Sequence, residues 1–451
     1  MSAEAAAAPP LRARLTSARV LAIAAPVALS NATVPIQGAV DTAVIGRLGD
    51  ASALAAVGLG AQIFSLLFGV FNFLQIASSG LAAQALGSGD PQRAAHTLIR
   101  AVGLAAAIAC ALLALQIPLL WLGLALFEAS AEAEGLTAAY FAWRIWGAPA
   151  ELANYALIGW FAGQEMTRRL FQHQVLLASV NVGLNLWFVL GLGWGVEGVA
   201  IGTALANLAG LAYGGWLAFG RVRRILPVAW RPNWERVLDR GELVRLMSMN
   251  RDIFIRTLLL IGGFAWTARL GSLQGDAVLA ANVVLLQFLM VSAYALDGFA
   301  IAAETLVGQA MGARDPGGLD RAAALTSIWS GGMAALCAAI FVLAGPAIVD
   351  LFTTAEEVRA IARRYLLWAA LIPIAGFAAF QFDGIFVGAT ASREMRDAMV
   401  LTACVYFPGS WAMLQAFGNH GVWGALWIWL LLRAATLAAY YPRIRARALE
   451  R

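Results

Sequence analysis

Long apolar runs dominate this chain and restrict what it can fold into. A transmembrane helix needs about 20 mostly apolar residues, and we count twelve such runs. They cover approximately residues 19–44, 53–84, 94–123, 137–163, 171–193, 196–219, 246–271, 278–309, 322–348, 359–388, 397–417 and 421–442. Only helices and closed barrels satisfy their backbone hydrogen bonds in hydrocarbon, and strands of alternating polarity are absent. The sequence therefore predicts an all-α polytopic membrane protein with twelve transmembrane helices.

The composition supports this class and excludes several activities. Hydrophobic residues make up 61% of the 451 residues and charged residues only 13%, against about 25% charged in soluble proteins. The sequence contains no lysine. A phosphate-binding P-loop and a Schiff base to retinal or pyridoxal phosphate both require lysine. An ATPase or a lysine-linked pigment protein is therefore excluded, and any energy source must be of another kind, such as an ion gradient.

The arginines predict the orientation in the membrane. Most of the 31 basic residues fall in the two tails and in the loops after even-numbered spans. Loops rich in arginine or lysine usually lie on the cytoplasmic side of the membrane. Both termini are therefore predicted to be cytoplasmic, with tails at residues 1–18 and 443–451. An arginine-rich stretch at residues 221–245 is interpreted as a cytoplasmic linker. Binding of anionic lipid headgroups is a secondary interpretation of this stretch, and nucleic-acid binding is not expected.

An internal repeat divides the chain into two halves. The segment LAAQALGSGDPQRAA, which starts at Leu81, matches LVGQAMGARDPGGLDRAA, which starts at Leu306, at a sequence offset of 225. The same offset relates Gly159 to Gly384. Two six-helix, pseudo-symmetric lobes at residues 19–220 and 246–442 are therefore predicted, related by an axis along the membrane normal. Transporters that work by alternating access have this organisation, with the substrate path between the lobes.

The first half places a carboxylate and several polar residues within apolar spans. Asp41 ends the first span, which also contains Pro26 and Pro35. Proline removes a helix hydrogen bond, so either residue can bend this span. Asn181 and Asn185 are four residues apart and share one face of the fifth span, and Thr203 follows in the sixth. We expect these side chains to form one polar pocket with Asp41; hydrogen bonds that only pack helices are the alternative for the asparagines.

The second half carries its own acids. Asp297 and Glu304 are seven residues apart in the eighth span and share a face, and Asp383 lies in the tenth span. A buried carboxyl group favours its uncharged form and can take up and release a proton, whereas a cluster of oxygen ligands can bind sodium. The residues alone leave both ions open. Four charged residues near span ends are expected to form structural ion pairs: Glu151, Arg251, Asp252 and Arg256.

The sequence predicts no catalytic residue, metal site or cofactor. Its three cysteines and three histidines are scattered and show none of the spacings of metal sites. A GxGxxG pattern at Gly193, Gly195 and Gly198 follows a membrane span rather than a β-strand, so it is interpreted as a turn.

Four segments together resemble a known family, the multidrug and toxic compound extrusion (MATE) transporters, and within it the DinF-like branch. They are VDTAVIGRLG around Asp41, LAAQALGSGD with its partner LVGQAMGARD, ALDGFAIAAETLVGQ around Asp297, and FQFDGIFVGAT around Asp383. The likeness extends over essentially all twelve spans. It implies two six-helix lobes that export cationic or amphipathic compounds by antiport with protons or sodium.

The resemblance also implies roles for individual residues. Asp41 belongs to an amino-lobe network with Asn181, Asn185 and Thr203, and protonation there bends the first span at a proline, matched here by Pro26. Some relatives carry an acid where this chain has Asn185, so the network is less anionic and protons are favoured over sodium. Asp383 resembles a coupling aspartate of another branch. Its partner acid in span seven is not evident here, so Asp383 ranks below Asp41, together with Asp297 and Glu304.

We therefore expect a proton-coupled multidrug antiporter of the bacterial inner membrane, acting as a monomer among membrane lipids. One alternative is a flippase for lipid-linked precursors, from the same broad superfamily. Such a flippase would favour a strongly cationic cavity, whereas the buried charges here are expected to be mainly acidic. A second alternative is an intramembrane enzyme; it is disfavoured because no metal motif and no GxSxG nucleophile motif is present.

Overall fold

The computed structural model describes residues 14–47, 50–127 and 129–449, and every regular element in these ranges is a helix. This confirms the all-α fold class. Most of the predicted amino-terminal tail, residues 1–18, and the last two residues of the carboxyl-terminal tail lie outside the described residues.

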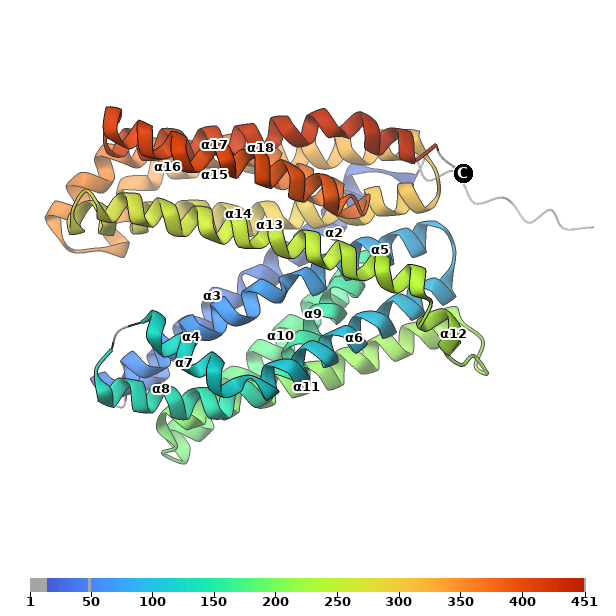
Figure 1. The fold of residues 1–451 in the computed structure, drawn as a ribbon, viewed down its shortest axis with the longest axis horizontal. Helices are drawn as coiled ribbons and strands as arrows, with labels where there is room; N and C mark the ends of the chain where they lie inside the picture. The colour runs from blue at the N-terminus through green and yellow to red at the C-terminus, as the bar shows by residue number, and fades with distance from the viewer. Residues whose placement is uncertain (1–13, 48–49, 128, 450–451) are drawn as a thin grey trace, which may run out of the picture. The chain divides into compact units, whose positions relative to one another are not determined.

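The helices follow one another with short connections (Figure 1). Those of the first half are α2 (Ser17–Asn31), α3 (Thr33–Gly46), α4 (Ala51–Gly69), η1 (Val70–Asn72), α5 (Phe73–Gly87), α6 (Pro91–Ala114), α7 (Gln116–Leu126), α8 (Ala131–Arg144), η2 (Ile145–Gly147), α9 (Ala148–Gly163), α10 (Thr167–Asn185), η3 (Leu186–Gly191) and α11 (Gly195–Ile225). The rest are α12 (Trp234–Val237), α13 (Arg240–Ser272), α14 (Asp276–Gly312), α15 (Pro316–Phe352), α16 (Glu356–Gly388), α17 (Ser392–Phe417) and α18 (Asn419–Arg447).

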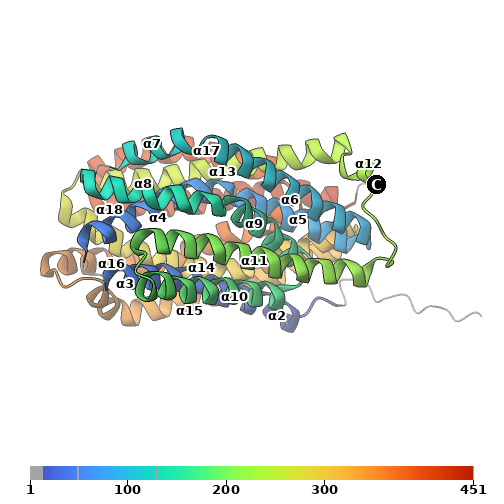
Figure 2. The same cartoon turned by 90° about the horizontal axis from the view of Figure 1, so that it is seen from below.

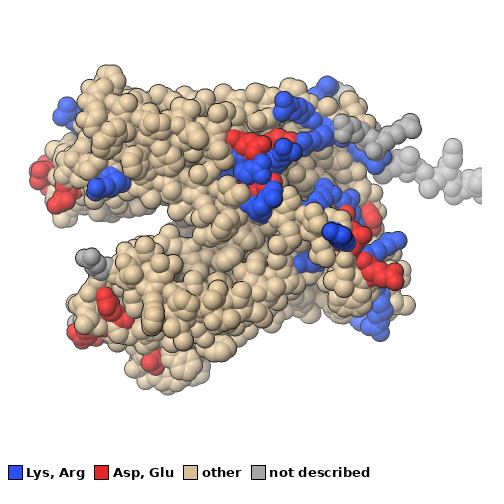
Figure 3. Space-filling model, viewed as in Figure 1, with Lys and Arg blue, Asp and Glu red and all other residues tan. Residues whose placement is uncertain are grey.

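Eleven helical stretches of the described chain are long and apolar enough to cross a membrane. The predicted span 137–163 is not among them. There the chain forms α8, the 3-10 turn η2 and α9, with 14, 3 and 16 residues, and carries the charged residues Arg144 and Glu151. The chain is thus a multi-pass membrane protein, and the count of twelve spans stays a prediction. On the face drawn in Figure 3, charged side chains gather in separate groups between broad uncharged stretches of surface.

The chain divides into two compact units. The carboxyl unit comprises the described parts of residues 1–28, 83–89 and 251–451, and the amino unit those of residues 29–82 and 90–250. The start of α2 and the end of α5 are thus part of the carboxyl unit. The predicted domain boundaries at 19–220, 221–245 and 246–442 were drawn from the sequence alone and stay a prediction.

Each unit has one central helix. In the carboxyl unit α16 packs against α14, α15 and α18 (Figure 1). Its core is rich in aromatic side chains, and the rings of Tyr406 and Trp429 stack with centroids 4.6 Å apart. In the amino unit α11 packs against α8, α9 and α10 (Figure 2).

Backbone geometry recurs at the sequence offset of 225. Asp90 and Asp315 both cap the helix that starts at the following proline, by accepting a hydrogen bond from a backbone N–H three residues on. The residues just before these caps, Gly89 and Arg314, have φ of 67° and 55°. Glu165 and Thr390, related by the same offset, have φ of 58° and 52°. These shared local structures support the predicted duplication, while the symmetry of whole lobes stays a prediction.

Repeat-related glycines allow close helix packing in both units. A Cβ atom at Gly159 of α9 would clash with the backbone carbonyl of Gln75, and one at Gly384 of α16 would clash with that of Ala300. Gln75 and Ala300 are themselves related by the repeat offset. Because only glycine lacks Cβ, it alone permits these approaches.

The first predicted span is interrupted at its middle. Pro26 lies within continuous helix α2, whereas regular structure breaks at Ala32, between α2 and α3. Pro35 has no N–H to donate to the carbonyl of residue 31, and its ring crowds that carbonyl, which accounts for the position of the break. The Thr33 hydroxyl donates to the Ser30 carbonyl at 2.7 Å and supports the interrupted turn.

We predict opposite effects of alanine at two glycines of the carboxyl unit. Gly384→Ala should destabilise the protein by about 1–3 kcal/mol, because its Cβ must displace a backbone carbonyl. Gly332→Ala in α15 meets open space and should leave stability unchanged or raise it by up to about 1 kcal/mol. The apparent Tm of the detergent-purified protein distinguishes the two. Equal Tm values for both variants would contradict the described packing.

Candidate functional site

The four predicted residues of the first half come together in the amino unit. The Asn185 amide of α10 donates to the carboxylate of Asp41 on α3 at 2.6 Å. The same amide group lies 3.4 Å from Asn181 Oδ1, and Asn181 donates to the hydroxyl of Thr203 on α11 at 3.0 Å. Both asparagines are fully buried. The structure therefore forms one hydrogen-bonded chain from Asp41 to Thr203.

Two local features position Asn185. It is the last residue of α10 before the π-helical turn η3, and such turns often occur at functional sites. On the facing helix α11, Gly202 lies directly against the Asn185 side chain, and a Cβ atom there would clash with Oδ1. The π-turn and the glycine together let this amide lie between two closely packed helices.

Asp41 forms no ion pair with the arginines that the structure describes. No ion pair joins its carboxylate to any residue in the described ranges. Arg144 interacts with Asp41 electrostatically, but its guanidinium is paired with Glu151 at 2.6 Å. Since Asp41 bonds an uncharged amide, it can gain or lose a proton without leaving a buried cation unpaired.

The polar network extends beyond the residues that the sequence singled out. The Asn207 amide contacts Glu151 and the Thr203 carbonyl, each at 3.2 Å, and Asn154 donates to the Asn207 carbonyl at 2.9 Å. His173 Nε2 lies 3.3 Å from Asn154 Oδ1. The signal for these residues was their polarity within apolar helices. Only their joint position in the fold shows that they continue the Asp41 network.

Asp383 has a different environment in the carboxyl unit. Its Oδ2 atom accepts hydrogen bonds from Arg256 of α13 and Arg433 of α18. The three side chains are only 13%, 10% and 4% exposed, respectively. Asp297 of α14 also interacts electrostatically with Arg256. In the related branch this helix, α13, carries an acid that partners the aspartate, whereas here it carries Arg256. Asp383 therefore lies between two buried cations.

Buried charges are not mainly acidic, so that expectation is wrong for the described residues. The buried charged side chains are Arg100, Arg144, Arg256, Arg433, Asp252, Glu304 and Glu394. All four arginines contact a carboxylate. Arg100 and Arg144 each pair with a glutamate, whereas Arg256 and Arg433 share the carboxylate of Asp383. Glu304 lies in α14, where its backbone carbonyl packs against Gly388.

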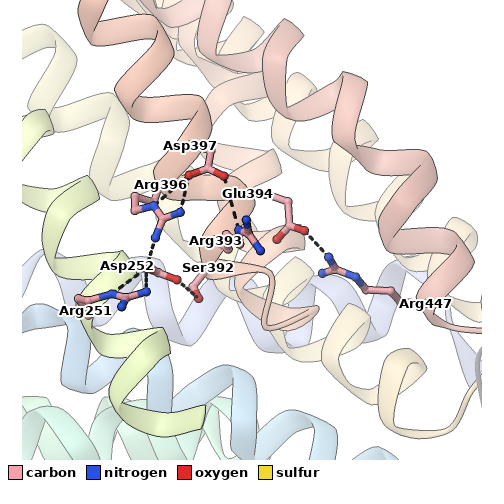
Figure 4. Close-up of polar contacts among 8 residues, drawn as sticks. All are labelled: Arg251, Asp252, Ser392, Arg393, Glu394, Arg396, Asp397 and Arg447. Carbon is pink, nitrogen blue, oxygen red and sulfur yellow. Dashed lines mark hydrogen bonds and ion pairs between the residues drawn. The ribbon is translucent and has the colours of Figure 1, made fainter. Parts of the chain in front are cut away.

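Asp252 belongs to a separate ion-pair network (Figure 4). Its buried carboxylate contacts Arg396 of α17 at 2.7 Å and Arg251 at 3.0 Å, and Arg396 also reaches Asp397 at 2.6 Å. Glu151 and Arg256 are also paired, as described above. The expectation that these lesser candidates form internal ion pairs agrees with the contacts. Across the described chain, no group of three or more His, Cys, Asp or Glu side chains is placed to hold a metal ion.

We predict a non-additive response when the Asp383 cluster is disrupted. Asp383→Asn leaves two buried guanidiniums without their carboxylate and should destabilise the protein by about 3–5 kcal/mol. Adding Arg433→Gln removes one of these charges and should recover part of the loss. The Tm values of the wild type, both single variants and the double variant test this. Additive losses, or a Tm of Asp383→Asn equal to that of the wild type, would contradict the described pairing.

A family model described as MatE matches this chain over residues 26–187 and 253–410. The two segments begin in the two predicted halves of the sequence at related positions. Together they cover most of the chain.

Known proteins agree with this match over nearly the whole length. DNA damage-inducible protein F of Escherichia coli (strain K12) is 36% identical over 437 residues, covering 93% of this chain and 91% of the relative. Probable multidrug resistance protein NorM of Bradyrhizobium diazoefficiens is 28% identical over 427 residues, covering 90% and 89%. A solved MATE structure in the bent conformation has a TM-score of 0.86 at 18% identity, covering 97% of each chain. This chain belongs to the MATE family of multidrug efflux transporters, and it is a transporter and not an enzyme.

Proposed function

We propose that this protein exports cationic or amphipathic small molecules across the bacterial inner membrane in exchange for protons. The names of its relatives support this substrate class, since one is a probable multidrug resistance protein. The proposed coupling residue is Asp41. The observation that carries the proposal is the contrast between its amide-bonded carboxylate and the doubly arginine-paired carboxylate of Asp383.

Protonation of Asp41 is compatible with its surroundings. A proton neutralises the carboxylate and weakens its charge-assisted hydrogen bond with Asn185 without breaking an ion pair. Protonation of Asp383, in contrast, would leave Arg256 and Arg433 uncompensated in a buried site. We therefore assign proton binding to Asp41 and a structural role to Asp383.

The orientation of Asn185 favours protons over sodium. Sodium needs several oxygen ligands, whereas the Asn185 amide presents its N–H group to Asp41. Asn181 likewise presents its N–H group to Thr203. The single carboxylate and these neutral side chains are better suited to a proton.

The interrupted first span offers a way to couple Asp41 to a change of shape. Asp41 lies on α3, after the break at Ala32, and the chain passes from the carboxyl unit to the amino unit within α2. Loss of the Asp41 charge would release α3 from Asn185, and the break lets α3 move separately from α2. We propose Pro26 as a second point at which the first span bends. The proposal also includes two six-helix lobes and cytoplasmic termini.

Exchange requires that proton and substrate each disfavour binding of the other. In an outward-facing state Asp41 takes up a proton, the first span changes shape, and the bound substrate leaves. In an inward-facing state the proton is released and substrate binds again. The coupling is then a free-energy difference between the two states. Asp297 and Glu304 are assigned no part in proton binding.

We predict that drug-dependent proton release depends on Asp41. Inverted vesicles containing the full chain are acidified inside, and a pH-sensitive dye reports proton release when a cationic drug is added in sodium-free buffer. Wild type should respond, and Asp41→Asn should lose most of the response, because its amide cannot bind the proton. Asp383→Asn should respond in proportion to the amount of folded protein in the membrane.

The controls separate failure of this assignment from failure of folding. The amount of each variant in the membrane is measured by immunoblot and its Tm in detergent. Loss of the response only in Asp383→Asn would move coupling to the carboxyl unit. A wild-type response that requires sodium would contradict proton coupling.

A further inference from the structure

An apolar groove in the amino unit is not used by the proposed transport mechanism. It has a volume of about 520 Å³ and lies among α6, α9, α11 and the segment at residues 226–232. Its walls are mainly aliphatic, with Trp230 as an aromatic wall residue. The volume lies within the ~300–1,000 Å³ typical of small-molecule pockets.

Two arginines line this groove without an acidic partner. Arg223, at the end of α11, and Arg231 are both exposed, and neither forms an ion pair with another residue of the described chain. The Arg223 guanidinium packs 4.6 Å from the centre of the Phe219 ring, which also lines the groove. This contact keeps one positive charge beside the apolar surface.

In the neighbouring polar cavity, by contrast, arginines do have carboxylate partners. That cavity, of about 480 Å³, is lined by Arg93, Arg100 and Glu242, among others. Glu242 lies 3.6 Å from Arg93 and 3.5 Å from Arg100. The charges there are matched within the protein, whereas Arg223 and Arg231 have no carboxylate partner in the described chain and are exposed to an external anion.

The position of the groove indicates the source of that anion. The apolar span containing α11 ends at Ile225, so Arg223 and Arg231 flank the end of a membrane-spanning segment. The arginine distribution puts this end on the cytoplasmic side. A ligand here would meet hydrocarbon along the span and two positive charges at the headgroup level.

We propose that this groove binds one anionic phospholipid, with an acyl chain along its apolar wall and the phosphate between Arg223 and Arg231. Basic residues beside apolar surface at the cytoplasmic interface are typical of such sites. The same two charges would repel a cationic substrate. The site is therefore distinct from the proposed path of exported compounds and does not depend on Asp41.

Three variants of the full chain separate the contributions of charge and shape. Arg223→Gln with Arg231→Gln removes both positive charges from the groove. Arg224→Gln is the matched control, because Arg224 is adjacent and also exposed but does not line the groove. Gly215→Leu fills the groove, since Gly215 lines it and a Cβ atom there meets nothing within 4 Å.

Native mass spectrometry of the detergent-purified protein measures binding of dioleoylphosphatidylglycerol and dioleoylphosphatidylcholine. Wild type and Arg224→Gln should bind one phosphatidylglycerol in preference to phosphatidylcholine. The double arginine variant should bind phosphatidylglycerol about 30-fold more weakly, from the contribution of each arginine. Gly215→Leu should weaken binding of both lipids, and free glycerol phosphate should not compete.

Several results would overturn the proposal. Equal binding of the two lipids by wild type would show apolar contact without headgroup recognition. An equal loss in Arg224→Gln and in the double variant would show a diffuse charge effect. Full competition by glycerol phosphate would show an anion site without an acyl-chain site. Unchanged Tm values in detergent exclude misfolding as the cause of a loss.

Discussion

A charged side chain within apolar helices must be matched by a partner, and this requirement organises both units. Arg256 and Arg433 surround Asp383, and Arg144 pairs with Glu151. Loss of the charge of either carboxylate would leave a buried arginine without its partner. Asp41 is the exception on which the proposed mechanism depends, since its hydrogen-bond partner is an amide.

The sequence was sufficient to predict the helical class, the repeat and four members of the Asp41 network, but not the continuation of that network through Asn207. The length of each apolar run predicts a membrane-spanning helix. The constant offset between similar segments predicts two halves with the same pattern of spans. The recurrence reaches individual backbone conformations, as at Gly89 and Arg314. The spacing of Asn181 and Asn185 places them on one helix face. Their polarity within apolar spans predicted a shared pocket with Asp41 and Thr203, which the family resemblance also implied.

The partners of Asp383 were not predictable in the same way. Arg256 and Arg433 lie far apart in the sequence, and no periodicity relates them. Each was visible as a single charge in an apolar run, but only packing of α13, α16 and α18 assigns them one partner. The break of the first span shows a similar limit. Both Pro26 and Pro35 can bend a helix, and the regular structure is interrupted only near the second.

The central claim is that Asp41 carries the exchanged proton, and infrared difference spectroscopy can observe that proton directly. The purified protein is held at a pH at which Asp41 is protonated, and a cationic substrate is added. The account predicts loss of one carbonyl-stretch band of a protonated carboxyl group in wild type and in Asp383→Asn, and no such band in Asp41→Asn. Persistence of that loss in Asp41→Asn would contradict the account, because another carboxyl group would then be the one that releases its proton.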